Sequence, residues 1–261
     1  MQIKPKKSLG QNFLIDENIL KKICDAGNVD KTNSIVEIGP GTGNLTKYLI
    51  KKNPKNLFLI EKDKYFCEIL NNEFKSKVKI INDDILKIQN KIINIDNVII
   101  FGNLPYNIST KILISLIKNI EDKNLQKMVL MFQKEVADRI VAKTNSKEYG
   151  RLSVIAQWKM HIEKMTDISP ECFFPKPKVK STVLIFKPIK NYFKIKNIKN
   201  LEHITNVFFN ARRKMVKKPL KQLFKNYHNI SKKLNIDPNC RPQTLSPKRF
   251  FEICNEYELL F

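Results

Sequence analysis

Short apolar runs rich in isoleucine and valine alternate with amphipathic stretches between Ser34 and Phe186. Strands buried in a parallel sheet read as apolar runs of roughly four to eight residues, and the helices between them repeat about every 3.6 residues. The alternation therefore predicts repeated βα units and a parallel, doubly wound sheet. Seven strands are expected, at Ser34–Ile38, Asn56–Ile60, Val78–Ile81, Asn97–Phe101, Lys127–Phe132, Leu152–Trp158 and Thr182–Phe186.

The pattern changes after Pro188, where the valine-rich runs disappear. We therefore expect an α/β domain over residues 1–188 and a small all-helical domain over residues 189–261. Residues 159–180 hold three prolines and no clear crossover helix, which predicts an antiparallel strand pair at one sheet edge. Helical periodicity in the second domain predicts helices at Leu201–Phe209, Pro219–Phe224 and Ser246–Leu260.

The chain is strongly basic, with a formal net charge of +23. Such an excess concentrates polyanions around a protein, so nucleic acid is the expected partner. Coding bias toward lysine, asparagine and isoleucine can also raise the charge, but it explains the abundance of lysine better than it explains the clustering of the basic residues. No apolar run approaches the roughly 20 residues that cross a bilayer, and residues 1–10 lack the apolar core of a signal peptide. We expect a cytoplasmic protein that needs no membrane.

A glycine-rich turn, Gly39-Pro40-Gly41-Thr42-Gly43-Asn44, follows the first predicted strand. Glycines let the backbone approach a ligand closely, and the helix beginning at Leu45 presents free amides to an anionic group. A dinucleotide-binding fingerprint would place a glycine at position 44, so the spacing disfavours NAD or FAD. The turn resembles the first motif of class I (Rossmann-like) methyltransferases, which implies S-adenosylmethionine as cofactor and Gly39 and Gly41 as residues that bind it.

Two further carboxylates follow the next two strands. Glu61 lies about 20 residues beyond the turn, where an acid can accept the hydrogens of both ribose hydroxyls. Asp84 follows the third strand and is placed to accept a hydrogen bond from the adenine amine of the cofactor, with Ile85 packing on the ring. Asp83 is an adjacent competitor, and only the similarity of Asp84-Ile85-Leu86 to the methyltransferase pattern favours Asp84.

The segment Asn103-Leu104-Pro105-Tyr106 ends the fourth predicted strand, and ligands of open α/β sheets bind beyond the carboxyl ends of strands. It resembles the [DNS]-P-P-[FYW] motif of amino-methylating enzymes, with leucine before the proline. An adenine amine is a poor nucleophile, because its lone pair is delocalised into the ring. The side-chain oxygen of Asn103 and the carbonyl of Leu104 can each accept one amine hydrogen and so orient the nitrogen. Tyr106 offers a stacking face worth roughly 1 to 3 kcal/mol, and Asn103 is also expected to touch the cofactor.

A base inside a helix cannot reach such a site, so we expect the substrate to be an exposed adenine turned out of its stack. Residues 172–181 fit this need, because aromatic residues and prolines alternate there with Lys176, Lys178 and Lys180. Phe173 is expected on the face of the target base opposite Tyr106, with the lysines toward phosphates. Phe174 is adjacent, so the choice between the two phenylalanines stays open.

Together these motifs closely resemble the ribosomal RNA adenine dimethyltransferase family over nearly the whole chain. The resemblance implies that Asn12 and Leu14, in the segment Lys7–Asp16, contact the cofactor. The stretches Asn103–Asn107, Phe208–Lys214 and Arg241–Ser246 look like the branch that modifies the small ribosomal subunit. That branch dimethylates two adjacent adenosines in the 3′-terminal hairpin loop of small-subunit RNA, so the resemblance implies this substrate.

A basic run over Arg212–Lys221 reads as a helix with six cations in ten residues. Such a run fits contact with RNA phosphates, and Arg212, Arg213 and Lys214 are the candidate residues. We expect the partner to be small-subunit ribosomal RNA within a 30S subunit or its precursor. The scattered cysteines form no C-x-x-C pair, so we expect no metal, and we expect a monomer.

Three alternatives remain. A methyltransferase of large-subunit RNA, as in the macrolide-resistance branch, would keep the chemistry and change the partner. A noncatalytic RNA-binding assembly or transcription factor would keep the fold alone, although the intact Gly39, Gly41, Glu61 and Asn103 favour catalysis. A nicotinamide-dependent enzyme is disfavoured by the glycine spacing.

Overall fold

The computed structural model describes residues 10–88, 95–119 and 124–261, so Lys7, Ser8 and Leu9 of the N-terminal motif lie outside the described residues. The chain forms two compact units, one of Met1–Ala137 with His161–Pro188 and one of Asp138–Met160 with Ile189–Phe261. The sequence placed residues 138–160 in the first domain. They group with the helical unit because their side chains make hydrogen bonds to residues of that unit. For example, the hydroxyl of the buried Tyr149 donates to the Leu245 carbonyl at 2.9 Å.

The first unit is built on a seven-stranded sheet with the strand order β4-β3-β2-β5-β6-β9-β7. Neighbours from β4 through β6 are parallel, and β9 runs antiparallel to β6. This confirms the predicted sheet, and the order reverses between β2 and β5, which is where open α/β sheets bind ligands. The strands are β2 Ser34–Ile38, β3 Asn56–Glu61, β4 Lys79–Asn82, β5 Val98–Asn103, β6 Leu125–Gln133, β7 Met160–Ile168 and β9 Ser181–Pro188.

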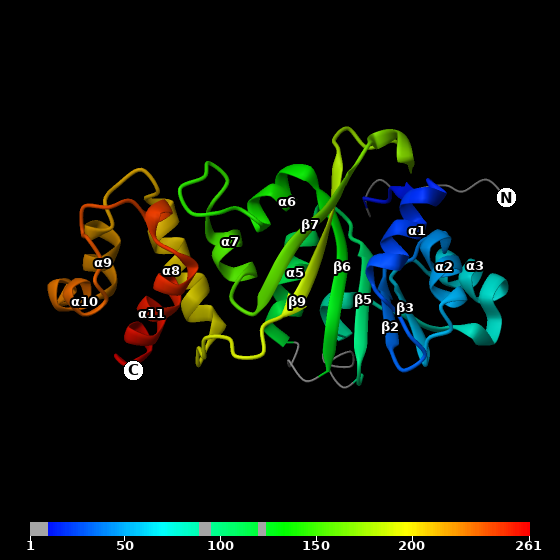
Figure 1. Ribbon diagram of the computed structural model, residues 1–261, viewed down its shortest axis with the longest axis horizontal. Helices are drawn as coiled ribbons and strands as arrows, with labels where there is room; N and C mark the ends of the chain where they lie inside the picture. Colours follow the sequence, from blue (N-terminus) through cyan, green and yellow to red (C-terminus); the bar gives the residue numbers. More distant parts are fainter. Residues whose placement is uncertain (1–9, 89–94, 120–123) are drawn as a thin grey trace. The chain divides into compact units, whose positions relative to one another are not determined.

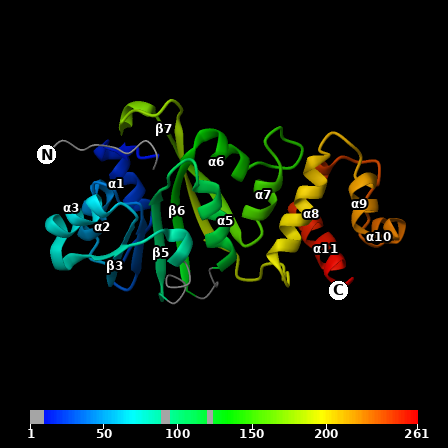
Figure 2. The same cartoon turned by 180° about the vertical axis from the view of Figure 1, so that it is seen from behind.

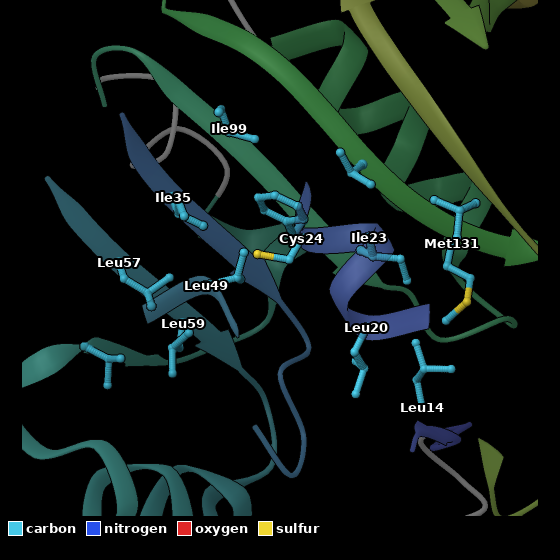
Figure 3. Close-up of a cluster of buried hydrophobic side chains, with 14 of the residues drawn as sticks. Leu14, Leu20, Ile23, Cys24, Ile35, Leu49, Leu57, Leu59, Ile99 and Met131 are labelled. Atoms are coloured by element: carbon cyan, nitrogen blue, oxygen red, sulfur yellow. The ribbon is translucent and has the colours of Figure 1, made fainter. Parts of the chain in front are cut away.

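Helices cover both faces of this sheet (Figure 1). On one face, side chains such as Leu20, Ile23 and Leu49 pack with alternate strand residues such as Ile35 and Ile99 in one buried cluster (Figure 3). Figure 2 shows α5 on the opposite face. Successive side chains of a strand point to opposite faces of the sheet, so every second residue from Ile35 or Ile99 toward the carboxyl end of its strand lies on the face of this cluster. The helices of this unit are α1 Glu17–Ala26, α2 Asn44–Lys51, α3 Lys64–Phe74 and α5 Ser109–Asn119, and α6 Lys134–Ile140 crosses into the second unit.

A second, two-stranded sheet joins segments far apart in the sequence. Strand β1, Phe13–Leu14, pairs antiparallel with β8, Phe173–Phe174, so that Phe13 lies opposite Phe174 and Leu14 opposite Phe173. Leu14 and Phe173 both belong to the buried cluster of the large sheet. The N-terminal motif and the proline-rich segment are therefore fixed to the same side of the core.

One predicted strand, Leu152–Trp158, is wrong. Residues Arg151–Ala156 form helix α7, and the strand is the following β7. Residues 152–156 are all buried, and a short run buried on every side has no periodicity that separates a helix from a strand. The strand β7 was not predicted for the opposite reason. Most of its side chains are polar and only its two end residues are buried, so it lacks the apolar run that marks a strand.

The second unit is helical, as the sequence predicts. The rings of Phe208 and Phe250 pack edge to face at 5.4 Å between centroids, and Ser246 caps α11 by accepting from the Arg249 amide. The basic run Arg212–Lys221 is not one helix, because α8 ends at Asn210 and α9 begins at Lys217. No helix among the described residues is long and apolar enough to cross a membrane. Besides α7, the helices are α8 Ile198–Asn210, α9 Lys217–Leu223, α10 Tyr227–Lys233 and α11 Pro247–Glu258.

Candidate active site

A cavity opens at the carboxyl ends of β2, β3 and β5, beside the point where the strand order reverses. All residues that line it belong to the first unit. The predicted cofactor and catalytic residues converge on this one space. They are Asn12, Leu14, Gly39, Gly41, Glu61, Asp84, Asn103, Leu104 and Tyr106.

The glycine turn between β2 and α2 has a backbone that side chains rarely tolerate. Gly39 and Gly41 have φ values of +67° and +54°. A Cβ at Gly41 would lie 2.7 Å from the ring of Phe13, whereas a Cβ at Gly39 would meet only the Asn103 carbonyl oxygen, at 3.7 Å. Gly41 is thus required by packing, and the space beside Gly39 is open to a ligand.

Glu61 ends β3 and is 7% exposed. Its Oε2 accepts a hydrogen bond from the Gly41 amide at 3.1 Å, and its Oε1 accepts from the Asp63 amide at 2.8 Å. Burial raises the pKa of Glu61, and the two amide bonds oppose that shift because they favour the charged carboxylate. Each oxygen keeps a further lone pair, so the group can still accept hydrogen bonds from the vicinal hydroxyls of a ribose.

Glu37, the penultimate residue of the buried strand β2, also lines the cavity, and our sequence reasoning missed it. It is 3% exposed and its Oε2 accepts from the Thr46 hydroxyl of α2 at 2.7 Å. Burial raises the pKa of Glu37 to about 8, although the Thr46 hydrogen bond opposes the shift. The available signal was a carboxylate among apolar residues of a strand, directly before the glycine turn.

Asp83 and Asp84 both line the cavity, next to the buried Ile85. Oδ1 of Asp84 accepts from the Leu86 amide at 3.0 Å, and its Oδ2 pairs with Lys62 Nζ at 3.0 Å. Burial would raise the pKa of Asp84, but these two interactions hold it below its ordinary value. The preference for Asp84 over Asp83 as the adenine contact stays a prediction.

Asn103 ends β5 on the same face as Ile99 and Phe101, and it reaches back to the N-terminal segment. Its Nδ2 donates to the Asn12 carbonyl oxygen at 2.7 Å. A carbonyl can only accept, so this bond fixes the orientation of the amide and leaves Oδ1 as an acceptor. Asn12 was identified only through resemblance, since the segment Lys7–Asp16 reads by itself as a basic tail.

Tyr106 lies half-buried beyond β5, and its hydroxyl is 2.5 Å from the Oγ of Ser181, the first residue of β9. Ser181 is fully buried, so this contact fixes the tilt of the tyrosine ring. Leu104, the next residue after Asn103, also lines the cavity and is 1% exposed.

Phe173 differs from its prediction. It is 3% exposed and belongs to the hydrophobic cluster, because it stands opposite Leu14 in the two-stranded sheet and shares its inward face. Phe174 points the other way and is 52% exposed. Neither ring lines the cavity, whereas Tyr106 does, so Phe173 is not placed opposite Tyr106 as predicted.

The three basic candidates of the second unit divide into two kinds. Arg212 bonds within its own unit, with Nη2 donating to the Ser146 carbonyl at 3.0 Å and Nε donating to Gln243 Oε1 at 3.3 Å. Arg213 and Lys214 are exposed in the turn between α8 and α9. Arg212 therefore stabilises the turn, and the other two remain free to meet a partner.

A family model described as Ribosomal RNA adenine dimethylase matches residues 2–259. A relative from Pelagibacter ubique (strain HTCC1062), named Ribosomal RNA small subunit methyltransferase A, is 50% identical over 99% of this chain and 98% of its own. A relative of the same name from Wolbachia sp. subsp. Drosophila simulans (strain wRi) is 40% identical over 99% and 96%.

Two solved structures share the fold. A dimethyladenosine transferase from Plasmodium falciparum is similar with a TM-score of 0.78, at 24% identity over 95% of this chain and 98% of that one. The 23S rRNA methyltransferase ErmE has a TM-score of 0.66, at 18% identity over 93% and 99%. The model match, the two relatives and the convergence of the motif residues on one cavity agree. The chain belongs to the ribosomal RNA adenine dimethylase family.

Proposed function

We propose that this chain uses S-adenosylmethionine to dimethylate the N6 amines of two adjacent adenosines in the 3′-terminal hairpin loop of small-subunit ribosomal RNA, during biogenesis of that subunit. The observation that carries the proposal is the amide of Asn103. Its nitrogen is held by the Asn12 carbonyl at 2.7 Å, which leaves its oxygen as an acceptor in a cavity that Glu61 and Gly39 also line.

The residues of the cavity fit the cofactor. The open space at Gly39 and the free amides at the start of α2 suit the methionine carboxylate, and Glu61 suits the ribose. The apolar side chain of Ile85 and the neighbouring aspartates suit an adenine ring and its amine. When bound, S-adenosylmethionine supplies an electrophilic methyl group on a sulfonium sulfur.

The protein's own contribution is to orient a weak nucleophile. The Oδ1 of Asn103 and the carbonyl of Leu104 accept the two amine hydrogens of the target adenine, which favours a tetrahedral nitrogen with a directed lone pair. Each methyl transfer leaves a positive charge on that nitrogen, which makes its N–H acidic enough to lose one proton to water. No strong base is therefore needed at Asn103.

Tyr106 holds the plane of the target base. Its hydroxyl is anchored to the buried Ser181, so the ring offers a face of fixed tilt to a base that enters the cavity. Stacking of a base on an aromatic ring contributes roughly 1 to 3 kcal/mol, which offsets part of the cost of unstacking the adenosine from its RNA.

The proposal includes the form of the substrate. The relatives' name, which refers to the small subunit, and the exposed Arg213 and Lys214 support small-subunit RNA within a 30S subunit or its precursor as the partner. We further propose that the protein works in the cytoplasm, where ribosomal subunits assemble, and that it acts as a monomer without a metal ion.

The test is methyl transfer to isolated subunits. The chain is incubated with 30S and with 50S particles and a cofactor carrying a labelled methyl group. Label in dimethyladenosine of the 30S RNA alone is expected. Label only in the 50S particle would replace the proposal by the large-subunit activity, and RNA binding without transfer would replace it by the noncatalytic role. Nucleoside mass spectrometry of ribosomal RNA from cells with and without the gene gives the corresponding result in vivo.

A further inference from the structure

Three large apolar side chains are exposed around the two-stranded sheet. Ile15 follows β1, Phe174 ends β8 and Val179 lies in the next loop, with 51%, 52% and 44% of their surface exposed. The Ile15 amide donates to the Cys172 carbonyl at 2.9 Å, so the strand pairing continues to Ile15. Isolated apolar residues are common on surfaces, but Ile15 and Phe174 lie on segments that are joined by hydrogen bonds, and Val179 follows in the loop after β8, so together they indicate a contact surface.

This surface lies at the rim of the cavity. Phe174 stands directly opposite Phe13 in the antiparallel pair, and such residues share a face with Cβ atoms about 5 Å apart. Phe13 lines the cavity and packs over Gly41, and the neighbouring Asn12 holds Asn103. Phe174 therefore stands beside a residue that lines the cavity, although its own ring does not line it.

The charges around the surface favour RNA as the occupant. Lys176, Lys178 and Lys180 follow Phe174 in the same loop, on both sides of Val179, and are all exposed. Lys176 pairs with Glu171 at 2.5 Å, whereas no carboxylate lies within 4 Å of the amino groups of Lys178 and Lys180 in the described part of the chain. The end of the loop is fixed, because the Lys180 carbonyl accepts from the Lys134 amide at 2.9 Å. An aromatic face with unpaired cations on a fixed loop matches the needs of a single-stranded nucleotide.

We propose that Phe174, together with Lys178 and Lys180, binds the unpaired nucleotide next to the target adenosine by stacking on its base and contacting its phosphate. The inference rests on the proposed function, because it assumes that an RNA base occupies the cavity. It assigns a distinct role to Phe174, since the target base stacks on Tyr106. With two adjacent adenosines as targets, this surface holds one while the other is at Asn103.

The test uses synthetic RNA hairpins with the fluorescent base 2-aminopurine placed on the 5′ or the 3′ side of the target adenosine. Stacking quenches this fluorophore. The wild-type protein should quench one of the two probes. Phe174→Leu keeps an apolar side chain but removes the aromatic face, so it should abolish the quenching and weaken hairpin binding about 10-fold. Phe174→Tyr should restore both.

Phe261→Leu is the matched control, because Phe261 is an aromatic residue with 92% exposure in the other unit. Cofactor affinity should be unchanged in all three variants. Unchanged quenching and affinity in Phe174→Leu would overturn the proposal and leave the surface to a protein partner. Absence of methyl transfer to 30S particles by the wild-type chain would sink the proposed function instead, since quenching requires binding only.

Discussion

The cavity of the first unit and the basic turn of the second unit hold candidate residues in different ways. In the cavity, nine candidates from five separate segments line one space. In the turn, three neighbouring cations divide, because Arg212 bonds inward while Arg213 and Lys214 are exposed. The ends of parallel strands bring distant residues together by construction, whereas a run of charge does not reveal which members face a partner. Residue roles are therefore more sharply defined in the first unit.

The largest effect is expected at Asn103. Asn103→Ala removes the oxygen that accepts an amine hydrogen, so turnover should fall about 100- to 1,000-fold in single-turnover methylation of 30S particles. Cofactor affinity, measured by calorimetry, should change less than about 10-fold, because the main proposed contact is to the target amine. Asn72→Ala, at an exposed position of α3, is the control. An equal loss of cofactor affinity would contradict the assigned role.

Glu61 tests the cofactor half of the same cavity. Glu61→Gln keeps the size of the side chain but removes the charge that accepts from the Gly41 and Asp63 amides. Hydrogen bonds to a charged group contribute about 1.5 to 3 kcal/mol, so cofactor binding should weaken roughly 10- to 100-fold in calorimetry. Glu68→Gln, exposed on α3, should bind as the wild type does. Normal binding by Glu61→Gln would remove Glu61 from the site.

The division within the basic turn can be tested by salt dependence. Arg213→Ala should lower the slope of log affinity for RNA against log salt by about 1 while leaving the melting temperature unchanged. Arg212→Ala should instead lower the free energy of unfolding by about 1 to 3 kcal/mol, because it removes the donor to Gln243 Oε1 and leaves the Ser146 carbonyl with only the longer bond from the Tyr149 amide, at 3.4 Å. Lys190→Ala, an exposed cation of the same unit, controls for loss of charge. If both arginine variants shift only the salt slope, the two arginines are equivalent.

The smallest effect is expected for Glu37, as a dependence of stability on pH. Burial raises the pKa of Glu37 from 4.5 to about 8, so the native state binds more protons than the unfolded state between these values. Its stabilising contribution is full below about pH 4.5 and is lost as the pH rises toward about 8. The melting temperature of Glu37→Gln should therefore fall less than that of the wild type between about pH 5 and about pH 8. Parallel profiles would show that Glu37 does not titrate in this range.

The sequence correctly predicted those elements in which apolar residues are buried and polar residues are exposed. The strands β3 and β5 are apolar runs that end in polar residues, and β2 leads directly into the glycine turn, so both the sheet and the cavity residues at its edge could be predicted. The pattern failed at α7, where burial on all sides hides the helical period, and at β7, where an exposed edge hides the strand.

Contacts between distant segments were also beyond reach of the sequence. Phe173 and Phe174 are adjacent and chemically identical, and only the pairing of β8 with β1 decides which one is buried. The inward bonds of Arg212 likewise depend on Ser146 and Gln243, which lie far from it along the chain. Such contacts follow from tertiary packing, which has no local signature.

The bond between Asn103 and the Asn12 carbonyl bears on why the reactive position holds an amide at all. An aspartate there would offer an equally good acceptor to an incoming base, yet its oxygens would repel the carbonyl behind it. The Asn12 carbonyl, directly before the two-residue strand β1, therefore favours asparagine over aspartate at position 103, independently of the reaction in the cavity. Asn103 thus serves two constraints at once, because its Nδ2 holds the N-terminal segment while its Oδ1 stays available to the target amine. A substitution that meets only one of these needs would lose the other.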